Sequence, residues 1–394
     1  MPRAVAPRPS VTDTPTPSCL GGRSRWRRLA GRLARLSTTG LIVAAITGLL
    51  YEAVSTSLDA RRYPPLGELV DVGGYRLHLH CRGSDGPTVV LEAGLGRDVL
   101  DWSWVQPGLA KHTRTCAYDR AGAGWSDPGP KPRDSRRIAS ELRTLLIRAG
   151  IDRPVVLVGH SAGGSHIQVF QHLYPDAVAG MVLIDVSHRA EPIQTAPPRA
   201  MVALAKALRA VDVLRVFGWM DGNDLPPAAQ AMENALMYRP DAISTIVAEN
   251  QAVDANRRDV REISGAGSLG ALPLVVITAA GEVEDQPRPP GMSLDAARRD
   301  LALRHQLQRR LLTLSTDSRQ VLAEHSGHQV HKDQPELVIT EIAELVESLR
   351  RADRDAADGD ITEPSVEPAT ISADPSIGGE TRMERTSTLD DNSV

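Results

Sequence analysis

The sequence is poor in aromatic residues, in cysteine and in excess charge of either sign. Only 3% of its 394 residues are aromatic, so aliphatic side chains must fill any core that it forms. Three cysteines are too few for a disulfide scaffold, and they lack the spacing of zinc ligands. The 45 basic and 49 acidic residues give a formal charge of −4, which excludes the basic excess typical of nucleic-acid-binding proteins. Hydrophobic residues nevertheless make up 41% of the chain, which excludes a wholly disordered protein.

The amino-terminal part combines a basic segment with an apolar one. We expect residues 1–35 to be a disordered, basic, cytoplasmic segment, because residues 1–22 have little apolar content and arginines follow them. Residues 36–58 have about the length of one bilayer crossing and predict a transmembrane helix. The arginines before this segment predict that the amino terminus stays in the cytoplasm, so the rest of the chain would face outward. A cleaved signal peptide and a buried helix of a soluble domain are the alternatives.

Short β-rich runs alternate with helical stretches between residues 63 and 350, which we expect to form one domain. Eight runs predict strands, at residues 68–72, 75–80, 88–92, 115–118, 155–158, 180–184, 274–278 and 320–323. Gly73-Gly74 predicts a hairpin between the first two. Helical stretches between the later strands, such as 136–149 and 165–174, indicate parallel crossovers. We therefore expect an α/β fold with one eight-stranded, mostly parallel sheet.

Two further segments depart from this alternation. Residues 187–270 contain helix-like stretches at 199–216 and 227–237, and an interruption of this length predicts a helical cap over the carboxyl ends of the strands. Residues 351–394 are acidic and polar without an apolar period, so we expect a disordered tail.

The motif Gly159-His160-Ser161-Ala162-Gly163 matches G-x-S-x-G, which holds a serine nucleophile on a sharp turn between a strand and a helix. The pattern alone is weak. Its context strengthens it, because the apolar run 154–158 precedes the motif and a stretch compatible with a helix follows it. We therefore predict that Ser161 is a nucleophile.

A serine hydroxyl needs a base to remove its proton, and such a base is oriented by a carboxylate. His328 follows the last predicted strand in a Ser-Gly-His loop and is the predicted base, whereas His325 and His331 are interpreted as surface or packing residues. The acid should lie between Ser161 and His328 in the chain. Asp185, at the end of the sixth strand, is preferred, and Glu284, after the seventh, stays open as the alternative.

Negative charge that develops on a substrate oxygen requires backbone donors. The amide of Ala162, directly after the nucleophile, is one predicted donor. The other is the amide of Leu95, in the glycine-containing loop 92–96 that follows the third strand. We expect these two amides to form an oxyanion hole.

Taken together, these motifs resemble the α/β-hydrolase superfamily, specifically membrane-anchored bacterial serine hydrolases in which a hydrophobic helix precedes the catalytic domain. The matching segments are 63–67, 75–81, 91–96, 118–126, 158–164 and 326–328. The resemblance implies a serine hydrolase with Ser161 and His328 in the roles given above. Many members carry Gly-x-x-Asp after the seventh strand, where this chain has Gly281-Glu282-Val283-Glu284.

The resemblance also places the second and fourth strands side by side, so Cys81 and Cys116 could be bridged or could remain free thiols. An exported domain would keep such a bond.

The predicted function is hydrolysis of an ester, amide or related acyl bond of a small-molecule substrate through a Ser-His-Asp/Glu triad and an acyl-enzyme. The alternative is a binding protein of the same fold that holds a lipid or peptide without catalysis. Neither a metal nor an organic cofactor is expected, because ligand clusters and phosphate-binding loops are not evident in the sequence. The other expected partner is a lipid bilayer at the cell membrane, with the hydrolase domain outside the cytoplasm.

Overall fold

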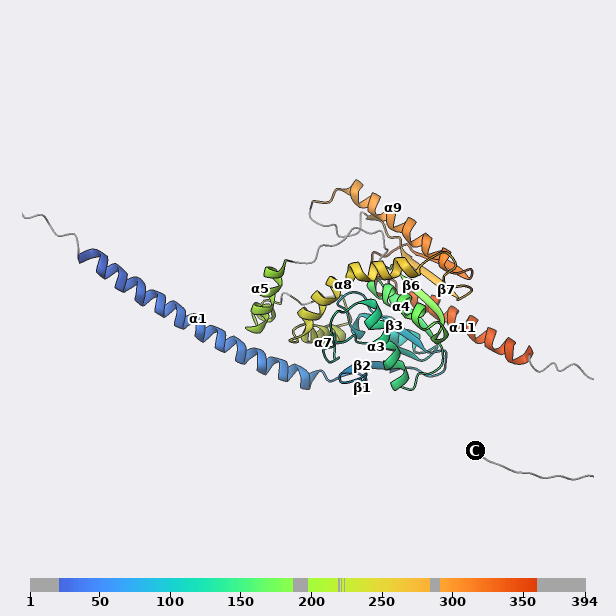
Figure 1. Ribbon diagram of the computed structural model, residues 1–394, viewed down its shortest axis with the longest axis horizontal. Coiled ribbons are helices and arrows are strands. Elements are labelled where there is room, and N and C mark those ends of the chain that lie inside the picture. The colour runs from blue at the N-terminus through green and yellow to red at the C-terminus, as the bar shows by residue number, and fades with distance from the viewer. Residues whose placement is uncertain are drawn as a thin grey trace, which may run out of the picture. The chain divides into compact units, whose positions relative to one another are not determined.

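A computed structural model describes residues 21–186, 198–218, 220, 222, 224–283 and 291–359 (Figure 1). Its centre is one eight-stranded sheet with the strand order β1-β2-β4-β3-β5-β6-β7-β8. The strands are β1 (Glu68–Asp71), β2 (Arg76–Arg82), β3 (Val89–Glu92), β4 (Thr115–Tyr118), β5 (Val155–His160), β6 (Val178–Ile184), β7 (Leu274–Ala279) and β8 (Ser318–Ala323). The pairs β1–β2 and β2–β4 are antiparallel, and the other pairs are parallel. The predicted eight-stranded, mostly parallel sheet is therefore confirmed.

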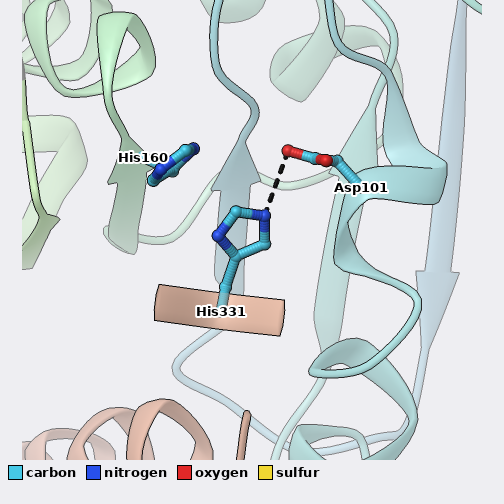
Figure 2. A group of neighbouring side chains, drawn as sticks. All are labelled: Asp101, His160 and His331. Carbon is cyan, nitrogen blue, oxygen red and sulfur yellow. Dashed lines mark hydrogen bonds and ion pairs between the residues drawn. The ribbon is translucent and has the colours of Figure 1, made fainter. Parts of the chain in front are cut away.

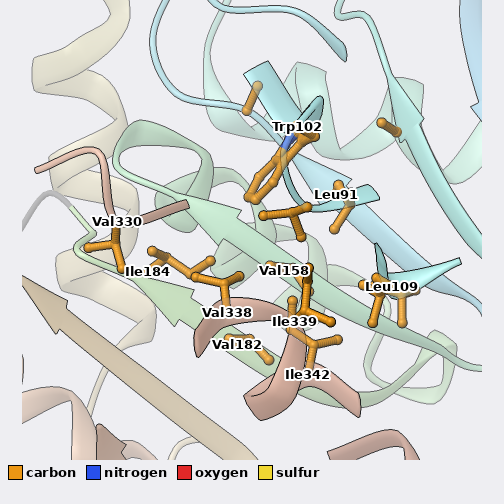
Figure 3. Close-up of a cluster of buried hydrophobic side chains, with 14 of the residues drawn as sticks. Leu91, Trp102, Leu109, Val158, Val182, Ile184, Val330, Val338, Ile339 and Ile342 are labelled. Atoms are coloured by element: carbon orange, nitrogen blue, oxygen red, sulfur yellow. The ribbon is translucent and has the colours of Figure 1, made fainter. Parts of the chain in front are cut away.

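Apolar side chains cover both faces of the sheet, as the near-continuous apolar runs of its central strands require. Along β5, Val156 and Val158 belong to one buried cluster, and Val155 and Leu157 belong to the other. The first cluster is completed by the helix α11 (Pro335–Gly359), whose buried side chains lie against those of β5 and β6 in Figure 3. The second contains side chains of α3 (Ser135–Arg148) and α4 (Ala162–Leu173). Alternation along each strand thus supplies both layers of the core.

The remaining elements of the hydrolase domain lie in its loops and connections. They are η1 (Val99–Trp102), α2 (Gln106–Leu109), η2 (Pro175–Ala177), α9 (Leu294–Leu311), η4 (Leu312–Leu314) and α10 (Val330–Asp333). Of these, η1 and α10 matter for the site, because they carry residues that support the loop of His328.

In the described part of the segment between β6 and β7 there are four helices, and we refer to them as the cap. They are α5 (Arg199–Ala210), α6 (Val213–Val216), α7 (Pro227–Met237) and α8 (Ala242–Ile263). The expected helical stretch 199–216 is interrupted near Asp212, whose φ of 60° is incompatible with a continuous α-helix. α8 was not predicted. Residues 187–197, where the expected cap begins, lie outside the described residues.

The first helix, α1 (Gly21–Arg62), is longer than the predicted transmembrane segment 36–58. It begins inside the segment 1–35 that we expected to be disordered, because arginine, leucine and alanine favour helix formation. Residues 1–20 lie outside the described residues. Within the part that the structure describes, residues 31–62 are the one stretch of helix long and apolar enough to cross a membrane.

The carboxyl-terminal helix also passes a predicted boundary. α11 continues to Gly359, whereas the disordered tail was expected to start at residue 351. The alanines and charged residues of this stretch favour helix formation, so the helix can continue for several more residues. Residues 360–394 lie outside the described residues.

Cys81 on β2 and Cys116 on β4 are directly opposite each other in the antiparallel pair and form a disulfide. The sequence did not decide between a disulfide and two free thiols, because the answer depends on the pairing of two strands that are distant in the chain. The bond links the antiparallel part of the sheet to its parallel part.

Candidate active site

Ser161 lies at the turn between the carboxyl end of β5 and the first residue of α4. Its backbone has φ 53° and ψ −120°, a conformation that is strained for any residue other than glycine. Its amide donates to Ile184 O on β6 at 3.1 Å, so the turn stays attached to the sheet. This combination holds the serine hydroxyl at the edge where the parallel strands end, as the motif predicts.

Two glycines of the motif are required by close packing around this turn. A Cβ added to Gly163 would lie 2.5 Å from Glu92 O and 2.7 Å from Ala93 O. A Cβ added to Gly159 would lie 2.8 Å from the backbone of Gly163. Larger residues at either position would therefore push α4 away from β3 and β5 and would displace Ser161.

His328 accepts a hydrogen bond from the nucleophile candidate. Its Nε2 lies 2.9 Å from Ser161 Oγ, and its Nδ1 lies 2.6 Å from Asp185 Oδ2. Because a carboxylate can only accept, Nδ1 carries the proton and Nε2 offers a lone pair to the hydroxyl. The structure thus brings together the three side chains to which the sequence assigned catalytic roles.

Asp185 is held more rigidly than the histidine that it orients. Its side chain is only 4% exposed, whereas that of His328 is 37% exposed. Its other carboxylate oxygen, Oδ1, accepts from Ala279 N at 3.3 Å, and its own amide donates to Ile277 O. Asp185 is therefore fixed between β6 and β7, while the ring of His328 is partly exposed. Glu284, the alternative acid, lies outside the described residues.

The loop that carries His328 is fastened at two points. Asp333 of α10 accepts hydrogen bonds from Ser326 Oγ and from Gly327 N, at 2.9 and 3.1 Å. On the other side, His160 Nε2 donates to the carbonyl oxygen of His328 at 2.8 Å. Burial lowers the pKa of His160 well below its ordinary value, so this ring is neutral at pH 7. His160, a variable position of the motif, thus supports the base rather than reacting itself.

The loop after β3 runs beside the nucleophile. A Cβ built on Gly94 would lie 3.5 Å from Ser161 Cβ, so this loop passes close to the serine. Leu95 follows in this loop, and Ala162 is the first residue of α4, where the amide has no acceptor within its own helix. Both residues are partly exposed at the site. Their amides remain the predicted oxyanion donors.

A buried arginine that sequence reasoning left without a role organises the same loop. Arg120, which follows β4, donates to Ala93 O at 2.8 Å and to Gly94 O at 2.7 Å. It also pairs with Glu92 of β3 and with Glu249 of the cap helix α8, each at 2.7 Å. All three charged side chains are fully buried. One guanidinium therefore ties the sheet, the cap and the loop 93–97, which we call the oxyanion loop after its predicted role, together.

The two carboxylates around Arg120 respond differently to this environment. Burial raises the pKa of Glu92, which also accepts a hydrogen bond from Tyr118. Burial would raise the pKa of Glu249 as well, but Arg120 outweighs it and lowers that pKa below the ordinary value. Glu249 additionally accepts a hydrogen bond from Gly96 N at 2.9 Å, so its carboxylate contacts the loop after β3 directly.

Asp101, His160 and His331 offer ligand atoms within 4.8 Å of one another, a separation that raises the question of a metal (Figure 2). Asp101 is already bonded to His331 at 3.1 Å, to Lys332 at 2.6 Å and to Arg97 at 3.0 Å. Burial alone would raise the pKa of Asp101, but His331 and the two cations hold it well below its usual range. Two cations therefore compensate the carboxylate already, and we interpret this group as support for the neighbouring loops rather than as a metal centre.

Comparisons with known proteins place this geometry in context. A sequence model of the alpha/beta hydrolase fold matches residues 87–255. A curated AB hydrolase superfamily protein of Gibberella zeae is 27% identical over 290 residues, which cover 67% of this chain and 87% of that protein. Other matches are shorter: the chain spans 18% of the length of a probable transporter of Hormonema carpetanum and 51% of the uncharacterized protein YbdG of Bacillus subtilis.

Solved structures agree on the fold. An enol-lactonase from Burkholderia xenovorans LB400 is 20% identical with a TM-score of 0.53, and the match covers 71% of this chain and 100% of that one. The epoxide hydrolase CorEH is 20% identical with a TM-score of 0.52, over 72% of this chain and 98% of that one. Identities this low show the fold alone. The chain has the α/β-hydrolase fold, and proteins of this fold that it resembles are hydrolases.

Removing the charge of Arg120 should be among the most destabilising changes at this site. We expect Arg120→Met to lower the free energy of unfolding by about 3–5 kcal/mol, because it leaves two buried carboxylates without a counterion. The buried carboxyls would then take up protons on folding, so the stability of the variant should fall as the pH rises from 5 to 8. Denaturant titration of the detergent-solubilised chain measures both effects.

The matched control is Arg120→Met combined with Glu92→Gln and Glu249→Gln, which should recover part of the loss and remove its pH dependence. A loss below about 1 kcal/mol in the single variant would contradict the central role of this cluster.

Proposed function

We propose that the protein is a serine hydrolase that cleaves an ester, an amide or a related acyl bond of a small-molecule substrate. The observation that carries the proposal is the continuous hydrogen-bonded series from Ser161 Oγ through His328 to Asp185, at 2.9 and 2.6 Å. The hydrolases among the proteins of similar fold support the same reaction class. Serine, rather than aspartate, at position 161 favours acyl transfer over nucleophilic chemistry that forms an alkyl-enzyme ester.

The proposed reaction has two halves. Ser161 Oγ attacks the substrate carbonyl carbon while its proton passes to His328 Nε2, and the carbonyl oxygen becomes an oxyanion. The amides of Leu95 and Ala162 would donate to that oxyanion, in water-poor surroundings where such bonds are strong. The tetrahedral intermediate then collapses, the leaving group takes the proton from His328, and an acyl-enzyme remains.

Water completes the cycle by the same steps in reverse order. His328 removes a proton from water, the hydroxide attacks the acyl carbon, and Ser161 regains its proton as the acid product leaves. Asp185 keeps the proton on Nδ1 and stabilises the imidazolium in both halves. Its burial against β6 and β7 supports this orienting role, because the ring cannot turn without losing the 2.6 Å bond.

We also propose that α1 anchors the protein in a cell membrane, with the hydrolase domain outside the cytoplasm. Residues 31–62 have sufficient length and apolar content, and arginines precede them. The disulfide between Cys81 and Cys116 supports the outward side, because such bonds persist in oxidising compartments.

The identity of the acid can be tested by two substitutions. We expect Asp185→Asn to lower kcat for a short-chain nitrophenyl ester by roughly 10⁴-fold, because the neutral amide favours the wrong tautomer of His328. Ser161→Ala should reduce turnover to the background rate. Glu284→Gln should change kcat by less than about twofold, because Asp185 already orients His328 through Nδ1.

Thermal melts would establish that each of these variants is folded. Loss of activity in Glu284→Gln together with retained activity in Asp185→Asn would overturn the assignment of the acid. Wild-type activity in folded Ser161→Ala would overturn the proposed reaction and leave the binding protein as the better interpretation.

Orientation is tested by protease treatment of bacterial cells that express the chain. Protease added to intact spheroplasts should cleave the hydrolase domain, because we place it outside the cytoplasmic membrane. A cytoplasmic marker protein should survive in the same sample. A hydrolase domain that is cleaved only after lysis would contradict the outward orientation.

A further inference from the structure

The cap is attached to the candidate transmembrane helix as well as to the hydrolase sheet. α1 contacts α5 and α7. Glu52 of α1 is buried and pairs with Arg209 of α5 at 2.7 Å, and Asp59 of α1 pairs with Arg215 of α6. A Cβ added to Gly48 would lie 2.5 Å from Val211 O, so the two backbones approach closely. These contacts show that the cap lies beside the carboxyl-terminal part of α1.

The part of α1 that contacts the cap coincides with one end of the proposed membrane crossing. About 20 helical residues span the hydrocarbon core. A crossing that begins at Gly31 therefore ends near Leu50, and one that begins at Leu36 ends near Ser55. Gly48 lies in the last turns of the crossing in either case, and Glu52 lies in its last turn or just beyond its end. The cap helices that touch them must lie at the level of the lipid headgroups, next to the end of the hydrocarbon core.

The outer surface of the cap carries exposed apolar side chains, as expected for a surface at the membrane interface. On α5, Met201 is 55% exposed and Leu204 is 58% exposed, and at the end of α6 Val216 is 67% exposed. α5 has no fully buried residue. Its inner side chains contribute to a small cluster with those of α6 and α8, so its apolar outer residues are not required for packing within the chain.

Basic residues accompany this apolar surface. Arg199 and Lys206 are exposed on α5, the helix that also carries Met201 and Leu204. Amphipathic helices that lie in a membrane interface combine apolar residues, which enter the acyl boundary, with lysine and arginine, which attract anionic lipids. A soluble surface rarely carries large apolar side chains on neighbouring helix turns without a binding partner.

We propose that α5 and α6 lie in the outer membrane interface and form a second contact with the bilayer, besides α1. The occupant of this surface is a lipid bilayer that contains anionic headgroups, because the surface continues from a helix that crosses the bilayer and carries exposed basic residues. The side-chain contacts of the cap with Arg120 and with Gly96 make this contact relevant to the site, because the cap that would touch lipid also touches the loop beside Ser161. The lipid contact rests on the proposed membrane anchor α1, and this last consequence rests in addition on the proposed hydrolase function.

The experiment uses the full chain in nanodiscs of phosphatidylcholine and phosphatidylglycerol. Leu204→Cys, in a Cys19→Ser background, is labelled with an environment-sensitive fluorophore, and quenching by spin-labelled lipids is measured. The matched control is Ile147→Cys, because Ile147 on α3 is also 55% exposed and belongs to the hydrolase body. The label at position 204 should be quenched at least about twofold more than the label at position 147, since only the former lies among acyl chains.

Equal quenching at the two positions would overturn the proposal. A second result would also overturn it: the fluorescence of the label at position 204 is blue-shifted, is not quenched by the spin-labelled lipids and changes with protein concentration. That result indicates contact with a second copy of the chain. Both labelled variants should melt close to the unlabelled protein. The readout does not involve turnover, so an inactive enzyme would count against the proposed function without affecting this result.

Discussion

The candidate active site depends on one backbone constraint, the strained turn at which β5 ends and α4 begins. Ser161 can keep its left-handed conformation only because the helix is pressed against the sheet, and that contact exists because Gly159 and Gly163 have no side chain. The hydroxyl consequently has a fixed position relative to the strand ends. Asp185 and His328 reach it from the loops after β6 and β8, which the parallel order of the sheet brings to the same edge.

A second, electrostatic constraint acts on the surrounding loops. Arg120 satisfies two carbonyl groups of the oxyanion loop and two buried carboxylates, one of which belongs to the cap. Such a cluster is costly to bury unless every member is paired, and this requirement fixes the loop, the sheet and the cap in one arrangement. The cap also contacts α1, through the pair of Glu52 with Arg209. The proposed lipid contact therefore involves the same group of helices that contacts the loop beside Ser161.

Much of this arrangement could be predicted from local patterns. The apolar runs of the central strands, the glycines around Ser161 and the loop before His328 carry their structural requirements in adjacent residues. What could not be predicted depends on contacts between distant segments. The choice between Asp185 and Glu284 and the bridge between Cys81 and Cys116 require strand positions. The break of the helical stretch 199–216 depends on the backbone conformation of one residue, and the beginning of α1 depends on helix propensity. The role of Arg120 depends on its burial, and a sequence does not indicate that a charged residue is buried. The catalytic roles themselves remain predictions that the geometry supports.

The central claim is that folding gives Ser161 the reactivity of a nucleophile by placing it beside His328. The most direct measurement is covalent labelling of the full chain with a fluorophosphonate, followed by peptide mass mapping. The account predicts one label, on Ser161, that is lost in His328→Ala although this variant remains folded. Absence of labelling in the folded wild-type chain, or labelling of Ser161 that persists unchanged without His328, would contradict it.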